Sequence, residues 1–224
     1  GVMTENSDNA FMPATINPFY MVCYSYNGGE TKISADLSSY MNGYQDPRRE
    51  IYGVTSTFDE SENITNGFHG LRVGNEYPIK TGQCYSNVKV EVSSPIMWMN
   101  AAEVMFLRAE AALRGWDTEK TPKAYYEAGI RLSFEQLGAK NVEDYLVSTN
   151  TPESYKDPLG TYSFSGTPST ISVQWKDGNF EESLERIITQ KWIANFPLGL
   201  EAWAEFRRTG YPKLMGTASN KDRK

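Results

Sequence analysis

The sequence has few of the residues that catalysis and metal binding use most often. Among 224 residues there is one histidine, His69, and there are two cysteines, Cys23 and Cys84. Nucleophilic catalysis through a Ser-His-Asp or Cys-His set would therefore have to use His69. Two cysteines so far apart form neither a zinc motif nor a C-x-x-C motif, and they allow a single disulfide. We expect two buried thiols, no metal and no cofactor.

The chain also lacks a long apolar run and an excess of basic residues. No stretch approaches the roughly 20 apolar residues of a membrane-spanning helix. Lys and Arg number 22 against 28 Asp and Glu, which gives a formal net charge of −6. Because phosphate backbones are bound by clustered Lys and Arg, we expect no nucleic-acid partner. The fractions of hydrophobic and charged residues, 39% and 22%, are typical of a globular protein.

Residues 1–93 are expected to form a loop-rich region with short helices and strands. Turn-forming pairs such as Asn17-Pro18, Asn42-Gly43 and Asn66-Gly67 interrupt this region repeatedly. Valines alternate with polar residues over 87–92, which predicts a strand. A short helix is predicted over residues 35–41.

Residues 94–138 are predicted to form a first helical hairpin. Ser94 can cap a helix whose first position is Pro95, and Gly115 is placed to end it. Thr121 and Pro122 repeat this start before a second apolar stripe that stops at Gly138. Two helices joined by a short loop are expected to pack antiparallel.

Residues 139–178 are predicted to be a loop insertion with one short helix over 142–147, and residues 179–224 a second helical hairpin with a C-terminal tail. Asn179 followed by Glu182 resembles a capping box. After a break at 197–199, a fourth helix is expected to stop near Gly210. Hairpins separated by insertions resemble tetratricopeptide units, whose helix pairs stack on one another.

Five segments resemble, in order, segments of the SusD-like family. They are Asp46-Pro47-Arg48, the stretch SPIMWMNAAEVMFLRAEAALRGW at 94–116, YEAGIRLS at 126–133, ERIITQKWIA at 185–194 and EAWAEFRRTGYP at 201–212. The resemblance covers about residue 40 to the end.

This resemblance implies a mainly α-helical fold, a tetratricopeptide-like α-α superhelix with long loop insertions and a few short strands. The chain would be the C-terminal half of one SusD-like domain. The resemblance further implies a surface-exposed lipoprotein of the outer membrane of a Bacteroidetes-type bacterium, which binds oligosaccharide without catalysis. The protein would deliver it to a SusC-like TonB-dependent transporter, and its N-terminal lipid anchor would lie outside this sequence.

Sugar rings present apolar C–H faces, so a glycan site needs aromatic planes beside groups that hydrogen-bond hydroxyls. Three groups of loop residues fit this description: Tyr40 and Tyr44 with Asn42, Gln45 and Asp46; Phe68, His69, Arg72 and Tyr77; and Tyr155, Tyr162, Phe164 and Trp175. The predicted ligand-binding residues are Tyr40, Asn42, Tyr44, Phe68, Arg72, Tyr162 and Trp175. We expect Trp98, Trp192 and Trp203 to pack in a core or an interface, and Arg207 and Arg208 to join ion pairs or close a helix.

Three other functions remain open at this point. Some members of the family serve peptide importers, and the acidic chain would then favour basic peptides. A tetratricopeptide-like scaffold that binds only proteins is a second alternative. Glycoside hydrolysis is a third, but acidic residues are so numerous that pairs of carboxylates occur by chance, and we expect no enzyme.

Overall fold

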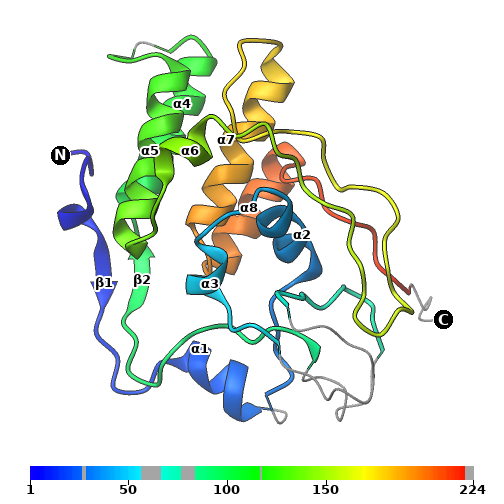
Figure 1. The fold of residues 1–224 in the computed structure, drawn as a ribbon. Helices are drawn as coiled ribbons and strands as arrows, with labels where there is room; N and C mark the ends of the chain where they lie inside the picture. Colours follow the sequence, from blue (N-terminus) through cyan, green and yellow to red (C-terminus); the bar gives the residue numbers. More distant parts are fainter. Residues whose placement is uncertain (27–28, 57–66, 77–83, 117, 220–224) are drawn as a thin grey trace. The chain divides into compact units, whose positions relative to one another are not determined.

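The structure is a computed structural model that describes residues 1–26, 29–56, 67–76, 84–116 and 118–219. Figure 1 shows the helices and strands of the chain. The chain forms two compact units, each built from segments that are separated in the sequence. Unit 1 contains residues 1–13, 95–151 and 171–213, and unit 2 contains residues 14–94, 152–170 and 214–224. The fold is mainly helical, as the sequence predicts. The predicted division into four segments along the chain stays a prediction.

Unit 1 contains most of the helical residues. Its helices are α4 (Ala101–Leu113), α5 (Pro122–Leu137), α6 (Val142–Leu146), α7 (Phe180–Ala194), α8 (Gly199–Thr209) and the 3-10 turn η1 (Asn6–Asp8), and its strands are β1 (Ala10–Met12) and β2 (Ile96–Met99). α4 packs along α5, and α7 packs on both. Gly129 of α5 lies against the Phe106 ring of α4, where a Cβ would come within 2.8 Å of a ring carbon. Because glycine has no Cβ, α4 and α5 can pack closely at this point.

The predicted start of α4 at Ser94 and Pro95 is wrong. Residues Ile96–Met99 form β2, which pairs antiparallel with β1, and the helix begins six residues later at Ala101. The cap is Asn100, whose extended backbone lets its side chain accept a hydrogen bond from the Glu103 amide at 2.8 Å. Because β1 lies far away in the sequence, no local pattern could reveal that residues 96–99 have a strand partner.

The other three long helices agree with the sequence. Thr121 caps α5 by accepting from the Ala124 amide, and Gly138 follows the helix with a left-handed backbone. The Asn179 side-chain oxygen caps α7 by accepting from the Glu182 backbone amide at 2.8 Å, and the Asn179 side-chain amide donates to the Glu182 carboxylate at 3.2 Å. α8 stops before Gly210, which is also left-handed.

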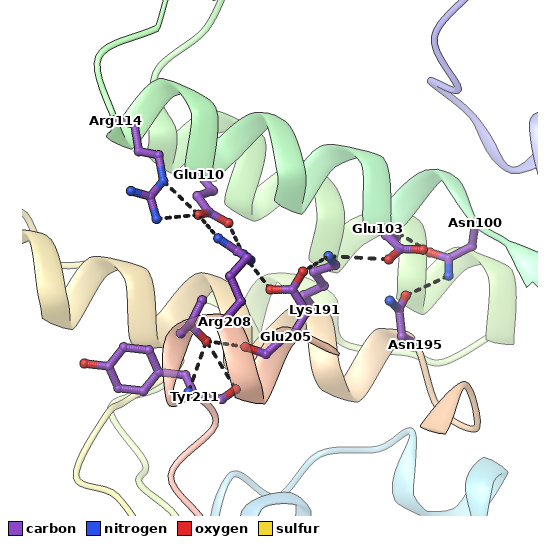
Figure 2. A network of polar contacts seen from close by, with 10 residues as sticks. Asn100, Glu103, Glu110, Arg114, Lys191, Asn195, Glu205, Arg208 and Tyr211 are labelled. Carbon is purple, nitrogen blue, oxygen red and sulfur yellow. Dashed lines mark hydrogen bonds and ion pairs between the residues drawn. The ribbon is translucent and has the colours of Figure 1, made fainter. Parts of the chain in front are cut away.

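A row of charged side chains fixes α8 to α4 and α7 (Figure 2). Lys191 of α7 lies 2.9 Å from Glu205 of α8 and 3.4 Å from Glu103 of α4. Arg208 of α8 binds Glu110 of α4 with both terminal nitrogens, at 2.5 and 2.6 Å. This is the structural ion pair predicted for Arg208.

Unit 2 consists mainly of loops around short helices. The helices are α1 (Pro18–Tyr20), the π-helical turn η2 (Met21–Ser25), α2 (Ala35–Gly43) and α3 (Arg49–Tyr52). α2 confirms the helix predicted over 35–41. The strand predicted over 87–92 is wrong, because only Val88 forms an isolated bridge, to Gly53. The chain opposite Val88 begins at Gly53, directly after α3, and three residues later Ser56 pairs with Gly67 instead. Residues 87–92 therefore have no extended partner strand there.

The core of unit 2 includes the face of α2 and the turn that follows it. Tyr40, Met41 and Tyr44 are buried, and so is Arg48, whose guanidinium lies 2.6 Å from the Asp46 carboxylate. A buried pair of this kind is expected to set the conformation of the turn more than to add stability. Cys23 and Cys84 are buried thiols and are not linked, as predicted.

Candidate functional site

Unit 2 contains a pocket of about 270 Å³ beside α2. Its lining residues are Ser38, Asn42, Phe68, His69, Glu153, Ser154, Tyr155 and Lys156. The pocket brings together members of all three groups of loop residues predicted from the sequence. It is therefore the candidate binding site.

The floor of the pocket consists of side chains that already hold internal hydrogen bonds. Ser38 donates to the Ala35 carbonyl and accepts from the Gly70 amide, at 3.0 and 3.1 Å. The Asn42 side-chain amide donates to the Phe68 carbonyl at 3.0 Å, and its oxygen accepts from Arg49 at 3.2 Å. These bonds fix the floor in place before any ligand arrives.

We call the segment 153–156 the wall of the pocket, and its polar side chains are unpaired within the part of the chain that the structure describes. The Glu153 carboxylate, the Ser154 hydroxyl and the Lys156 ammonium form no hydrogen bond or ion pair with any part of the chain that the structure describes. The backbone of the wall is nevertheless anchored, because Glu153 exchanges hydrogen bonds with Ser39 of α2. Polar groups that are positioned but uncommitted are suited to hydrogen-bond a ligand.

A buried carboxylate follows the wall directly in the sequence and organises the loop after it. Asp157 accepts hydrogen bonds from the Tyr85 hydroxyl at 2.7 Å and from the Thr161 and Tyr162 amides at 3.0 and 3.1 Å. Burial and the hydrogen bond to Asp157 raise the pKa of Tyr85, so the phenol stays protonated and donates. Tyr155 donates to the Gly70 carbonyl at 2.7 Å, which joins the wall to the floor.

Two predicted ligand-binding residues lie in the core. Tyr40 and Tyr44 are 0% and 2% exposed, and their rings meet edge to face at 5.8 Å between centroids. In this position they support α2, and neither ring presents a face to solvent. A direct contact of Tyr40 or Tyr44 with ligand stays a prediction.

Arg72 and Tyr162 lie in unit 2 but outside the lining of the pocket. The Arg72 guanidinium donates to the carbonyls of Gly216, Tyr162 and Ser163 at 2.9–3.2 Å and lies over the Phe164 ring. With these contacts Arg72 connects the loop at 157–164 with the C-terminal segment. The Tyr162 hydroxyl makes a long hydrogen bond of 3.4 Å to the Glu76 carbonyl.

Trp175 belongs to unit 1, so it is not among the pocket residues of unit 2. Its ring packs against Tyr126 of α5 at 5.3 Å between centroids, and its indole nitrogen donates to Asp177 at 3.0 Å. Tyr77, a member of the second predicted group, lies outside the described residues. The ligand-binding roles of Asn42, Phe68, Arg72, Tyr162 and Trp175 stay predictions.

Sequence reasoning missed the three available side chains of the wall. Glu153, Ser154 and Lys156 surround Tyr155, which the sequence did single out. Their proximity to an aromatic residue was the one signal present. Exposed charged residues are too common in loops for that signal to be decisive.

The part of the chain that the structure describes contains no cluster that would hold a metal ion. Within the described ranges, no three or more His, Cys, Asp or Glu side chains come together for that purpose. The helices that the structure describes are also too short or too polar to cross a membrane.

Comparison with known proteins gives the family. The model of the SusD-like family, described as SusD and RagB outer membrane lipoprotein, matches residues 1–224. The chain belongs to the SusD-like family. This membership, which the sequence motifs predicted, places the chain among outer-membrane lipoproteins. No curated protein matches the chain significantly.

Solved structures of SusD homologues are similar along almost the whole chain. One from Bacteroides ovatus ATCC 8483 is 48% identical over 98% of this chain, with a TM-score of 0.90. One from Bacteroides thetaiotaomicron VPI-5482 is 45% identical over 97%, with a TM-score of 0.89. A homologue from Flavobacterium johnsoniae, described as chitin-binding, is 40% identical over 97%, with a TM-score of 0.86.

The chain spans less than half the length of these SusD homologues. It covers 47% of the Bacteroides ovatus protein, 45% of the Bacteroides thetaiotaomicron protein and 45% of the Flavobacterium johnsoniae protein.

Proposed function

We propose that this SusD-like chain belongs to a protein that binds oligosaccharide at the outer-membrane surface, without catalysis, and delivers it to a SusC-like TonB-dependent transporter. The observation that carries the proposal is its similarity to the chitin-binding SusD homologue, at 40% identity over 97% of this chain. Peptide binding by the same kind of importer is the alternative, and the experiment must distinguish it from oligosaccharide binding.

We propose the pocket of unit 2 as one contact point for the glycan. Its volume of about 270 Å³ is just below the roughly 300–1,000 Å³ that drug-sized ligands occupy, so it would accept about one sugar unit. The Lys156 ammonium and the Ser154 hydroxyl can donate to sugar hydroxyls, and the Glu153 carboxylate can accept from them. A binding site for a longer chain would need further contacts outside this pocket.

The lining of the pocket favours capture over hydrolysis. Glycoside hydrolases commonly use two carboxylates on opposite sides of the scissile bond. Glu153 is the single carboxylate among the lining residues. The neighbouring Asp157 does not line the pocket and is 5% exposed. One carboxylate beside one ammonium fits reversible hydrogen bonding.

The test is calorimetric titration of the full-length protein with chitin oligosaccharides and with a panel of other polysaccharide fragments. We expect binding of at least one glycan, and we expect Lys156→Ala to weaken it by about 10- to 150-fold, because a hydrogen bond to a charged group contributes about 1.5–3 kcal/mol. Lys140→Ala is the matched control, since Lys140 is an exposed lysine of unit 1.

Two outcomes would contradict the proposed glycan binding, and a third would contradict the role of the pocket. The first is binding of basic peptides with no binding of any glycan. The second is release of reducing ends during prolonged incubation, which would indicate hydrolysis. The third is equal loss of affinity in Lys156→Ala and Lys140→Ala, which would remove the pocket from the site while leaving the glycan assignment intact.

A further inference from the structure

Residues 214–219 belong to unit 2 and are bound to it through their backbone. The Met215 amide donates to the Asp36 carboxylate of α2 at 2.6 Å. Further along, the Ala218 amide donates to the Val73 carbonyl at 2.7 Å. We call residues 214–219 the strap.

Two further contacts fix the middle and the end of the strap. The Arg72 guanidinium donates to the Gly216 carbonyl with two of its nitrogens, at 2.9 and 3.2 Å. Gly74 has a left-handed backbone, and a Cβ at this position would lie 2.7 Å from the Ser219 carbonyl oxygen. The strap therefore packs closely against the backbone of unit 2 in addition to its hydrogen bonds.

One side chain of the strap contacts the wall of the pocket. Met215 is 7% exposed and forms a buried cluster with Ala35 of α2 and Tyr155 of the wall, against which Phe164 also packs. Tyr155 lines the pocket, and Met215 does not. Met215 therefore supports a pocket residue without lining the pocket itself.

This support is important because Tyr155 lies between two of the groups proposed to bind the glycan. The side chains of Ser154 and Lys156 have no hydrogen bond or ion pair within the described part of the chain, so their positions depend on the backbone at Tyr155. When a buried side chain is removed, its neighbours relax into part of the cavity that is left. A shift of Tyr155 toward such a cavity would move both binding groups, and hydrogen bonds weaken steeply when their geometry is lost.

We infer that the strap positions the wall of the pocket, with Met215 as the positioning residue, and that a bound ligand in turn stabilises the strap. The statement about ligand rests on the proposed function, whereas the statement about the wall does not. Coupling between two sites is reciprocal, so a ligand that needs the positioned wall must tighten the strap by the same factor. Such factors are typically about 5- to 150-fold.

The first experiment needs no ligand and measures amide hydrogen exchange in the full-length protein. The reporter is the Phe164 amide, which donates to the Tyr155 carbonyl at 2.8 Å. We expect Met215→Ala to speed its exchange at least about 5-fold, the lower end of typical coupling. Met215→Leu should restore a rate near that of the wild type, because leucine conserves the volume of the side chain. Unchanged exchange in M215A would overturn the inference.

Met97→Ala is the matched control, because it removes a methionine of similar burial, 8% exposed, from unit 1. It should leave the exchange of the Phe164 amide unchanged. If Met215→Ala prevents folding, Met215→Val takes its place, since it leaves a smaller cavity and should change the rate in the same direction. Equal acceleration by the substitutions at Met215 and Met97 would show a general loss of stability and would overturn the positioning role.

The second experiment is calorimetric titration with a glycan that binds the wild type. We expect Met215→Ala to weaken binding at least about 5-fold, Met215→Leu to restore it and Met97→Ala to leave it unchanged. Affinity equal to that of the wild type in folded M215A would overturn the inference. If no glycan binds the wild type, the proposed function fails, and the exchange of the Phe164 amide still decides whether the strap positions the wall.

The third experiment tests the reciprocal effect in the wild type. A saturating glycan should slow exchange of the Ala218 amide, which belongs to the strap and does not line the pocket, at least about 5-fold. A glycan that slows exchange at Phe164 but leaves the Ala218 amide unchanged would show that the wall and the strap are not coupled.

Discussion

At the scale of single residues, Gly70 has the least room for a side chain among the glycines that the structure describes in unit 2. A Cβ at this position would overlap the backbone carbonyl of Ser34, at the point where residues 33–35 and 71 exchange hydrogen bonds. Because the obstacle is backbone rather than a flexible side chain, Gly70→Ala has to separate the two segments. We expect it to lower the free energy of unfolding by about 1–3 kcal/mol, measured by urea denaturation.

Gly199 provides the matched control for this substitution. It occupies the first position of α8, no atom lies within 4 Å of a Cβ added there, and its φ is not in the left-handed region. Alanine at this site also restricts the unfolded chain, so Gly199→Ala should be neutral or stabilising by up to about 1 kcal/mol. Equal destabilisation by the two substitutions would contradict the steric account of Gly70.

The sequence predicted some pocket residues but could not determine which ones come together. Asn42, Phe68 and His69 were among the predicted groups, and all three line the pocket. Tyr40 and Tyr44 belonged to the same groups, but the turn of α2 places their rings inward. An aromatic residue in a loop looks the same in the sequence whether tertiary contacts bury it or expose it.

At the scale of elements, the attachment of α8 depends on the protonation of Glu110. Burial alone would raise the pKa of Glu110, but the hydrogen bonds from Arg208 and Arg114 hold it below its ordinary value. A carboxylate with a lowered pKa in the folded state contributes stability above its unfolded pKa of about 4.3 and loses it as the pH falls further. The attachment should therefore weaken below about pH 4.3.

The test is urea denaturation of the wild type and Glu110→Gln. At pH 7 we expect the substitution to lower the free energy of unfolding by about 1–2 kcal/mol, a figure reduced for solvent screening because Arg208 is 42% exposed. At pH 3 the two proteins should differ much less. Glu143→Gln, which removes an exposed partner of Arg131, is the control and should show no measurable change at either pH. A difference for Glu110→Gln that does not shrink with falling pH would contradict the ionic account.

Elements that depend on local signals were predicted correctly, and elements that depend on contacts between distant parts of the sequence were not. α5 could be predicted because its cap at Thr121, its proline at 122 and its glycine at 138 are all local signals. The stretch 96–99 could not, because its strand partner β1 comes from residues 10–12. Ser94 carried a valid local signal for a cap, and tertiary pairing overrode it.

At the scale of the whole molecule, the two units are interleaved along the chain, and unit 2 contains both thiols as well as the pocket. Burial raises the pKa of Cys23, and burial raises the pKa of Cys84 to about 11. Each thiol is 0% exposed, so a labelling reagent has to wait until unit 2 opens. The rate of thiol labelling under native conditions therefore reports how often unit 2 opens.

A ligand that binds the closed pocket should slow this labelling, because the labelling rate is proportional to the fraction of protein without ligand. If opening and closing are fast, the open population falls by the factor 1 + [L]/Kd, which is about 11-fold at a ligand concentration ten times the Kd. The measurement is the labelling rate of the two native thiols with and without the glycan identified by calorimetry, with Lys156→Ala as the weakened control. The rate in urea should not depend on glycan, since the unfolded chain has no pocket. A glycan that binds the protein with full heat release but leaves the native labelling rate unchanged would place the binding site outside unit 2.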